Sequence, residues 1–419
     1  MRVFESAGRQ MVIGGAGATD LAERFGTPLY VTDETALREN FRRICGAFCR
    51  HMPARIHYAA KANTNLAILR VLEREGSCID AVSMGEVESC LRVGFKPERI
   101  LYTGVAVSDA EMESLVAKGV MVNLDSRSQL RRLSKMGSNI PISIRVNPDV
   151  GAGHHEHVVT GSRRSKFGIP KDDIVKAYRE AMELGLDPMG LHAHIGAGVQ
   201  DLAPFIQVTD ALVSIAKEIE DSLGLGLDFI DIGGGIGIPY RPEEKAIDID
   251  ALAGEVTKRV KAGCSARAIA VEPGRDIIAD TTVLLTRVVD VKETPEKRFI
   301  GVDAGFNTLI RPSFYGAYHH IAVANKFGAP GEMAYDVVGP ICESGDFLGK
   351  DRLLPKVEEG DLIAVYDAGA YGYAMSSQYN SRPRCAEVLV KEGAASIIRE
   401  RESVDDLFRH QRMPSRLMV

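Results

Sequence analysis

A lysine, a histidine, a glycine-rich turn and an acid–arginine pair occur at the ends of successive apolar runs. They are Lys61 in YAAKAN, His194 in HAHIG, the GGGIG turn at 233–237, and Glu272 followed by Arg275 in EPGR. A lysine amine can form a Schiff base with an aldehyde, and glycine amides with an arginine can hold a phosphate. The set is therefore typical of a site for a phosphorylated aldehyde cofactor.

Each of these features alone also has an ordinary structural explanation. Lys61 is compatible with a solvated strand end, and His194 with a hydrogen-bonded core histidine. The GGGIG turn lacks GxGxxG spacing, so it is only a weak indication of a dinucleotide site. The residues HHEH at 154–157 offer metal ligands without a fixed helix face, and we predict no metal site there. Only the combination, at successive strand ends, favours a functional site.

The elements that must position these residues follow an alternating pattern of short apolar runs and amphipathic helical stretches. The eight candidate strands are residues 55–61, 78–83, 100–104, 120–126, 142–147, 189–196, 227–235 and 266–274. Strands that alternate with helices pair in parallel through right-handed crossovers, and eight of them close a (β/α)8 barrel with its site at the C-terminal strand ends. An open, doubly wound parallel sheet is the alternative fold.

The pattern changes after about residue 276. Segments such as TTVLLTRVVDVKE and DLIAVYDAG are rich in β-forming residues and are joined by loops containing Gly and Pro. We therefore expect an α/β protein with a (β/α)8 TIM-type barrel over residues 28–276. A C-terminal all-β domain over residues 277–419 would also take in short strands from residues 1–27.

Composition narrows the class of protein. The 419 residues include 51 Lys+Arg and 57 Asp+Glu, for a formal net charge of −6, without long runs of like charge. This balance disfavours nucleic acid or an anionic membrane as a partner. The sequence has no apolar run of about 18 residues and does not begin with a basic-then-apolar leader. Its seven cysteines are scattered, so we expect a cytoplasmic protein without a disulfide framework.

Longer segments resemble the fold-type III pyridoxal-phosphate decarboxylases. They are YAAKAN (58–63), HIG (194–196), DIGGGIGI (231–238), EPGR (272–275), VDAGFNTLIRPSFYGAYH (302–319), VVGPICESGDFLGKDR (337–352) and AGAYGYAMSSQYNSRPRCAEVLV (368–390). The similarity spans nearly the whole chain. It implies pyridoxal 5'-phosphate as the cofactor and a homodimer with active sites shared between subunits.

The resemblance also implies roles for the residues around the cofactor. Lys61 would bond to it covalently, His194 would pack against its ring, and Asp80 would be a supporting acid. Glu272 would keep the pyridine nitrogen protonated, so that the ring accepts the electrons released when CO2 leaves. The phosphate would be held by Gly235, Tyr371 and the amides of the turn formed by Glu272, Pro273, Gly274 and Arg275. The family usually has a serine where this chain has Ala197, so one hydroxyl contact to phosphate is absent.

Substrate recognition is implied in the same way. The matching residues are Arg275, Arg311, Tyr315, Glu343 and Tyr371. Cys342 matches the proton donor, and a thiol can donate near neutral pH. A guanidinium fork from Arg311 with an acid from Glu343 suits a substrate end that carries both a carboxylate and an ammonium. We therefore expect the decarboxylation of meso-2,6-diaminopimelate to L-lysine and CO2, the last step of lysine biosynthesis.

Other functions remain open at this point. A decarboxylase of the same fold can act on ornithine, lysine or a carboxylated polyamine precursor, whose far end needs only an acid. A racemase of related fold is disfavoured because Glu272 favours a strong electron sink. A catalytically inactive homologue that only binds a partner is disfavoured by the presence of Lys61, Glu272 and Cys342.

Overall fold

The structure, a computed structural model, describes residues 2, 4–150 and 165–418, and the chain divides into two compact units. We call the first the β unit; it comprises Met1–Ala36, Tyr240–Pro242 and Ala279–Val419. The second, the barrel unit, comprises Leu37–Pro239 and Glu243–Ile278.

The barrel unit contains a closed barrel of parallel strands, which confirms the predicted fold class. Its strands are β5 (Ala54–Ala59), β6 (Cys78–Ala81), β7 (Ile100–Tyr102), β8 (Met121–Leu124), β9 (Pro141–Asn147), β11 (Asp187–His192), β12 (Phe229–Asp231) and β13 (Ala268–Val271). They are arranged in the order β9-β11-β12-β13-β5-β6-β7-β8, and the pairing of β8 with β9 closes the ring. The short strand β10 (Ile169–Pro170) pairs with β9. Closure rules out the open doubly wound sheet.

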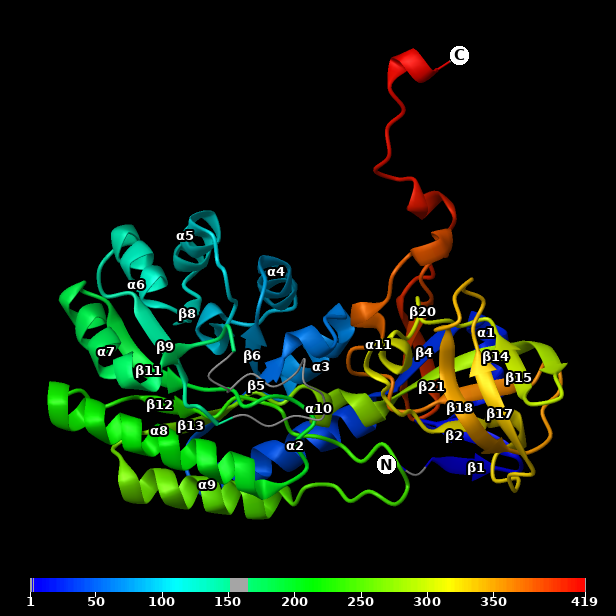
Figure 1. The fold of residues 1–419 in the computed structure, drawn as a ribbon, viewed down its shortest axis with the longest axis horizontal. Helices are drawn as coiled ribbons and strands as arrows, with labels where there is room; N and C mark the ends of the chain where they lie inside the picture. Colours follow the sequence, from blue (N-terminus) through cyan, green and yellow to red (C-terminus); the bar gives the residue numbers. More distant parts are fainter. Residues whose placement is uncertain (1, 3, 151–164, 419) are drawn as a thin grey trace. The chain divides into compact units, whose positions relative to one another are not determined.

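Helices alternate with the strands and surround them (Figure 1). They are α2 (Glu34–Cys49), α3 (Leu66–Arg74), α4 (Met84–Arg92), α5 (Asp109–Lys118), α6 (Arg127–Leu133), α7 (Ile174–Glu183), α8 (Leu202–Leu223), α9 (Ile249–Gly263) and α10 (Arg275–Ile278). Local sequence explains the helix ends. Ser108 and Glu111 form a reciprocal capping box at the start of α5, and Gly119, with a φ of 72°, ends it. Such caps fix where each loop at the barrel ends begins.

The β unit is built on a sheet whose longest strand is β14. The strands of this sheet are β4 (Leu29–Asp33), β14 (Thr282–Glu293), β15 (Arg298–Val302), β16 (Ile321–Val323), β17 (Met333–Val338), β18 (Phe347–Leu354), β19 (Leu362–Val365), β20 (Ala386–Lys391) and β21 (Ala394–Arg399). Strand β14 pairs antiparallel with β4, β15 and β19. The short helix α11 (Arg311–Tyr315) lies in the connection between β15 and β16.

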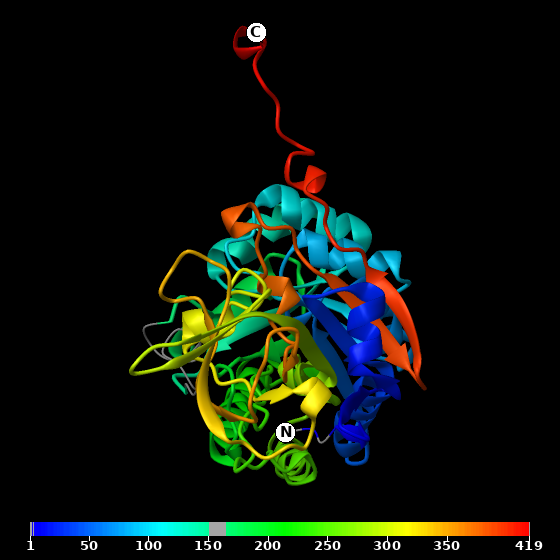
Figure 2. The ribbon, with the colours of Figure 1, turned by 90° about the vertical axis from the view of Figure 1, so that its right-hand side faces the viewer.

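The N-terminal strands belong to the β unit through its core. Strands β1 (Glu5–Ala7), β2 (Gln10–Ile13) and β3 (Ala16–Gly17) form a small sheet of their own, followed by α1 (Ala18–Phe25). Met11 and Ile13 are buried in one apolar cluster with Val283 and Leu285 of β14. The predicted inclusion of N-terminal strands is therefore confirmed, although they pack on the larger sheet instead of extending it. Figure 2 shows the C-terminal residues, in red, extending away from this unit's strands.

Two further features of the described residues bear on the class of protein. No helix among them has both the length and the apolarity needed to span a membrane. All seven cysteines are free.

Candidate active site

The barrel unit brings Lys61 and Asp80 into direct contact. Lys61 lies in a single 3-10 turn immediately after β5, and Asp80 lies in β6. Strands β5 and β6 pair in parallel with Ala59 opposite Asp80, which places the two side chains together. The Lys61 Nζ lies 2.5 Å from Asp80 Oδ2, and Thr103 Oγ1 donates to Oδ1 of the same carboxylate. A fully buried carboxyl group therefore holds the amine at a C-terminal strand end.

Glu272 follows β13 and is 3% exposed. Burial raises the pKa of this carboxyl, while Lys61, His57 and Arg145 favour its ionised form. Its Oε1 atom has no hydrogen-bond partner among the described residues. A buried acceptor without a donor is costly, so this atom fits a donor supplied by a ligand, such as a protonated ring nitrogen.

The turn that follows Glu272 packs against the end of β5. Ala59 N donates to Pro273 O over 3.1 Å. A Cβ added to Gly274 would lie 3.0 Å from the Ala59 Cβ, so no larger residue fits there without a shift. Arg275 opens α10 and is buried. The predicted EPGR turn thus lies next to the strand that carries Lys61.

The loops after β11 and β12 are interlocked through their glycines. Gly235 has a φ of 98°, and a Cβ there would lie 2.2 Å from Gly196 O. Val199 N donates to Gly235 O over 2.9 Å. His194, in the same loop, accepts from Gly196 N at Nδ1 over 3.1 Å. Burial, aided by Arg145 and Lys61, lowers the pKa of His194 well below its usual range, so its ring is neutral and suited to packing against another ring.

In the β unit, Arg311 opens α11 and is almost completely buried. Its Nη1 lies 2.8 Å from His319 Nε2, and its Cζ lies 5.0 Å from the centre of the Tyr240 ring. Tyr315 is half-buried at the other end of α11, where Gly316 caps the helix. The two predicted substrate residues therefore lie one helical turn apart.

Cys342 and Glu343 are exposed, and each contacts a residue that was not predicted as functional. The Cys342 thiol donates to Asn380 Oδ1 over 3.4 Å, and the Tyr379 hydroxyl donates to Glu343 Oε1. Tyr379 also stacks on Phe306, with ring centres 5.6 Å apart. The signal that could have identified both residues is their position in the family-like segment 368–390.

Two residues of the same segment have an unusual backbone conformation. Tyr371 has a φ of 59° and Asn380 a φ of 56°. The left-handed region is unusual for an aromatic residue and costs of the order of 1–3 kcal/mol, and such strain clusters at functional sites. The structure thus gives an independent reason to keep Tyr371 among the candidate residues.

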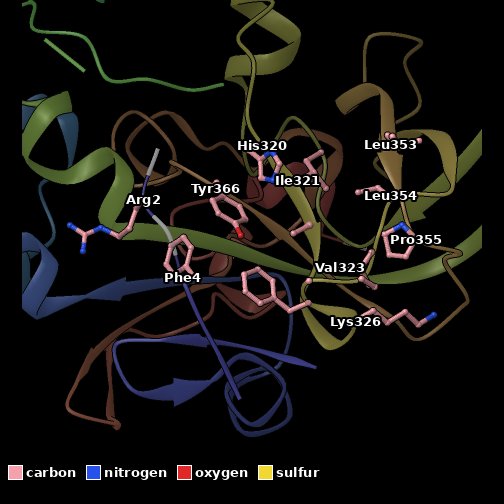
Figure 3. A pocket seen from close by; sticks show the side chains of 15 residues that line it. Arg2, Phe4, His320, Ile321, Val323, Lys326, Leu353, Leu354, Pro355 and Tyr366 are labelled. Atoms are coloured by element: carbon pink, nitrogen blue, oxygen red, sulfur yellow. The ribbon is translucent and has the colours of Figure 1, made fainter. Parts of the chain in front are cut away.

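A pocket of about 350 Å³ in the β unit is lined by none of the predicted residues. Figure 3 shows the rings of Phe4 and Tyr366 side by side in it, with centres 5.0 Å apart. Lys326 at its edge is paired with Asp361 over 2.7 Å. Its lining is largely apolar and includes the basic residues Arg2, His320 and Lys326 but no carboxylate, so we place the candidate chemistry elsewhere. The HHEH segment at 154–157 lies outside the described residues.

Comparisons with known proteins point to one kind of enzyme. The family model described as "Pyridoxal-dependent decarboxylase, pyridoxal binding domain" matches residues 35–279. A diaminopimelate decarboxylase of Methanothermobacter thermautotrophicus is 51% identical over 416 residues, which is 97% of each protein. One from Archaeoglobus fulgidus is 45% identical and covers 99% of this chain and 100% of its own.

A solved structure extends the similarity to the fold of both units. Diaminopimelate decarboxylase from M. jannaschii, in co-complex with L-lysine, matches with a TM-score of 0.94 at 33% sequence identity. The match covers 99% of this chain and 98% of that one. The chain is therefore similar to these proteins along its whole length, not in the barrel alone.

Proposed function

Since the chain belongs to the family of pyridoxal-dependent decarboxylases, we propose that it converts meso-2,6-diaminopimelate to L-lysine and CO2. The observation that carries this function is the 51% identity over nearly the full length of a diaminopimelate decarboxylase. The family resemblance predicted from seven sequence segments is confirmed. In this reaction one carboxylate leaves as CO2 and a proton takes its place on the same carbon.

The residues present fit pyridoxal 5'-phosphate. A buried lysine–aspartate pair, a partnerless buried carboxylate oxygen and glycine turns packed backbone to backbone occur at neighbouring strand ends. When bound, the cofactor supplies an electron sink for the carbon that loses CO2, while the protein supplies binding, orientation and protons. We assign the phosphate to Gly235, Tyr371 and the 272–275 turn. The absence of a serine hydroxyl at Ala197 places more of the phosphate contact on backbone amides.

Lys61 would hold the cofactor through its amine, and the bound cofactor would supply the carbonyl chemistry that activates the amino group of the substrate. The Asp80 carboxyl group, 2.5 Å from Nζ, fixes the direction of the amine. Glu272 keeps the proton on the ring nitrogen, because a carboxylate beside a pyridinium favours the charged form of the ring. His194 presents a neutral ring to the cofactor face.

In this proposal the groups that bind the substrate come mainly from the β unit, with Arg275 from the barrel unit. Arg275, Arg311 and Tyr315 bind the carboxylate that does not react, and Glu343 binds the distal ammonium. Cys342 donates the proton that replaces CO2. Its thiol already donates to Asn380, which holds the sulfur in one direction.

Assembly and compartment are also part of the proposal. We propose a homodimer in which residues 28–276 of one subunit bind the cofactor and the Cys342–Glu343 segment of the other completes the site. Residues 1–27 and 277–419 would form the dimer interface and contribute substrate contacts. The seven free cysteines support a reducing, cytoplasmic location.

The experiment is a substrate panel with the purified full-length chain. Loaded with pyridoxal 5'-phosphate, it should release CO2 and L-lysine from meso-diaminopimelate. Ornithine and lysine should react at least about a hundredfold more slowly by kcat/KM, because they leave the guanidinium site unfilled. A preference for ornithine or lysine would reject the proposed substrate but keep the reaction class. No turnover of any of the three would reject the activity.

A further inference from the structure

A chain of buried polar side chains crosses the interior of the barrel to reach Glu272. Asn123 in β8 donates from Nδ2 to His192 Nδ1 over 3.1 Å, and His192 Nε2 lies 3.3 Å from Glu272 Oε2. Strand β9 separates β8 from β11, and β12 separates β11 from β13. Contacts that skip a strand pass through the barrel interior, which is normally filled by branched apolar residues. The polar content here therefore calls for a function.

The contact from Asn123 fixes the tautomer of His192. An amide nitrogen can only donate, so Nδ1 of the ring must accept, and the ring proton of the neutral imidazole must be on Nε2. Burial lowers the pKa of His192 well below its usual range, which keeps the ring neutral. His192 Nε2 lies 3.3 Å from Glu272 Oε2 and has no hydrogen-bond partner among the described residues, so its N–H is available to this carboxylate.

A second buried pair lies on another side of Glu272. His57 Nδ1 is 3.6 Å from Asp231 Oδ2, and ligand atoms of His57, Asp231 and Glu272 lie within 4.8 Å of one another. Asp231 Oδ1 accepts from Gly233 N over 2.8 Å, whereas Oδ2 has no hydrogen-bond partner among the described residues. Two carboxyl groups this close in a low-dielectric interior disfavour each other's charge. Something must decide which of them is the anion and in which direction it points.

We propose that His192 is a positioning residue: its Nε2–H holds Oε2 of Glu272 and leaves Oε1 to accept from the ring nitrogen of the cofactor. This role rests on the proposed function and adds to it the group that orients the acid. Oε1 of Glu272 and Nε2 of His192 both lack a hydrogen-bond partner among the described residues, and Oε2 is the carboxylate atom that lies 3.3 Å from His192 Nε2. In this arrangement, Oε2 of the carboxylate accepts from His192 and Oε1 accepts from the cofactor.

The first test does not depend on activity. In protein labelled with 15N-histidine, the His192 resonance is identified by its loss in His192→Leu. Its Nε2 should carry the proton and its Nδ1 should be a bare acceptor, with and without cofactor. A proton on Nδ1 would overturn the proposal, even if the enzyme decarboxylates diaminopimelate normally.

The second test is a double-mutant cycle with Glu272→Gln. His192→Leu should lower kcat by roughly tenfold or more, because it removes a hydrogen bond to a charged group. In the Glu272→Gln background the same change should have little further effect, since the group through which His192 acts is gone. Equal losses in both backgrounds would mean that His192 fills space and nothing more.

Three companion variants complete the cycle. His192→Gln keeps an amide N–H and should recover part of kcat. Asn123→Leu leaves the imidazole in place but no longer fixes its tautomer. If His192→Leu does not fold, Asn123→Leu replaces it in the cycle and should show the same loss of kcat. Tyr178→Phe is the matched control, because the Tyr178 hydroxyl donates to Gly190 O of β11 over 2.6 Å. It should lower Tm with kcat unchanged, and a comparable loss of kcat would reject the specific role of His192. An inactive wild type with the Nε2–H tautomer would reject the proposed function alone.

Discussion

The Arg311 guanidinium donates from Nη1 to Nε2 of His319 over 2.8 Å, and both side chains are buried in the β unit. Because Nε2 accepts, Nδ1 carries the ring proton and donates to Tyr366 O over 2.7 Å. The Tyr240 ring lies 5.5 Å from His319 and 5.0 Å from the guanidinium carbon. His319 therefore holds Arg311 in one direction as a neutral acceptor, which does not cancel the guanidinium charge.

Arg311→Ala should therefore change substrate preference, not only activity. Loss of the guanidinium leaves the distal carboxylate without its charged partner, which typically costs about 3–5 kcal/mol for a buried pair. We expect kcat/KM for diaminopimelate to fall by a hundredfold or more by that estimate. The slow rate with L-lysine, which has no second carboxylate, should change little. His319→Gln keeps an acceptor for Arg311 and should retain most of the preference. Equal losses on both substrates would make Arg311 a structural residue.

Lys61→Ala should abolish the covalent attachment of cofactor and nearly all turnover. Because Lys61 lies in the turn after β5 and its side chain is about one-third exposed, Tm should change by only a few degrees. Borohydride treatment of the wild type should fix the cofactor to the peptide that contains residue 61, as read by mass spectrometry. Lys96→Ala, at an exposed lysine of the same unit, is the control and should be labelled normally. Wild-type turnover in Lys61→Ala would remove this residue from the mechanism.

The sequence predicts the barrel, and the same physical reason explains why Lys61 and Asp80 meet in it. Parallel strands of similar length end at one edge, so residues that follow successive apolar runs must gather there. In the register of β5 and β6, Asp80 lies opposite Ala59, and Ala59 is two positions before Lys61 in the sequence. The position of Glu272 after β13 follows from the same rule.

The polar interior of the barrel does not follow from the sequence. His57, His192 and Asp231 lie within strands buried on both faces, where no polar–apolar period marks which residues face inward. The contact of Tyr379 with Glu343 is also hidden, because 36 residues separate them. A contact such as Tyr379–Glu343 depends on how two loops of the β unit come together in space, and hydrophobic periodicity does not encode this.

The contacts of Tyr379 and Asn380 predict that a change at Tyr379 affects substrate binding, whereas a change at Asn380 affects the chemical step. Tyr379→Phe removes a hydrogen bond to the Glu343 carboxylate and should raise KM for diaminopimelate by about three- to tenfold, with kcat little changed. Asn380→Ala removes the acceptor of the Cys342 thiol and should instead lower kcat by about tenfold. Ser376→Ala removes a hydrogen bond to Tyr373 O from the same segment and is the control. If all three variants gave the same loss, the segment would be a scaffold without separate roles.

Acid should destabilise the barrel unit through His57. Burial lowers the pKa of His57 from 6.5 to about 4. As the pH falls below 6.5, the unfolded chain gains a proton that the folded chain refuses until about pH 4, so the free energy of unfolding falls with pH over that window. The free energy of unfolding should fall more steeply with decreasing pH in the wild type than in His57→Gln, by up to about 1.4 kcal/mol per pH unit. Urea unfolding at a series of pH values measures this free energy for both proteins. If it changed with pH by the same amount in the wild type and in His57→Gln, the lowered pKa of His57 would be contradicted.

Complementation tests the proposed sharing of the active site. Lys61→Ala and Cys342→Ala should each be nearly inactive as pure dimers. When the two are unfolded and refolded together, random pairing should give about half mixed dimers. Each mixed dimer holds one doubly mutated site and one intact site, so activity should reach roughly a quarter of wild type. If each subunit instead supplied both residues to its own site, every site would carry one mutation and activity would stay near zero. Subunit exchange is checked with a tag on one variant, since an absence of recovery in proven mixed dimers would reject the shared site.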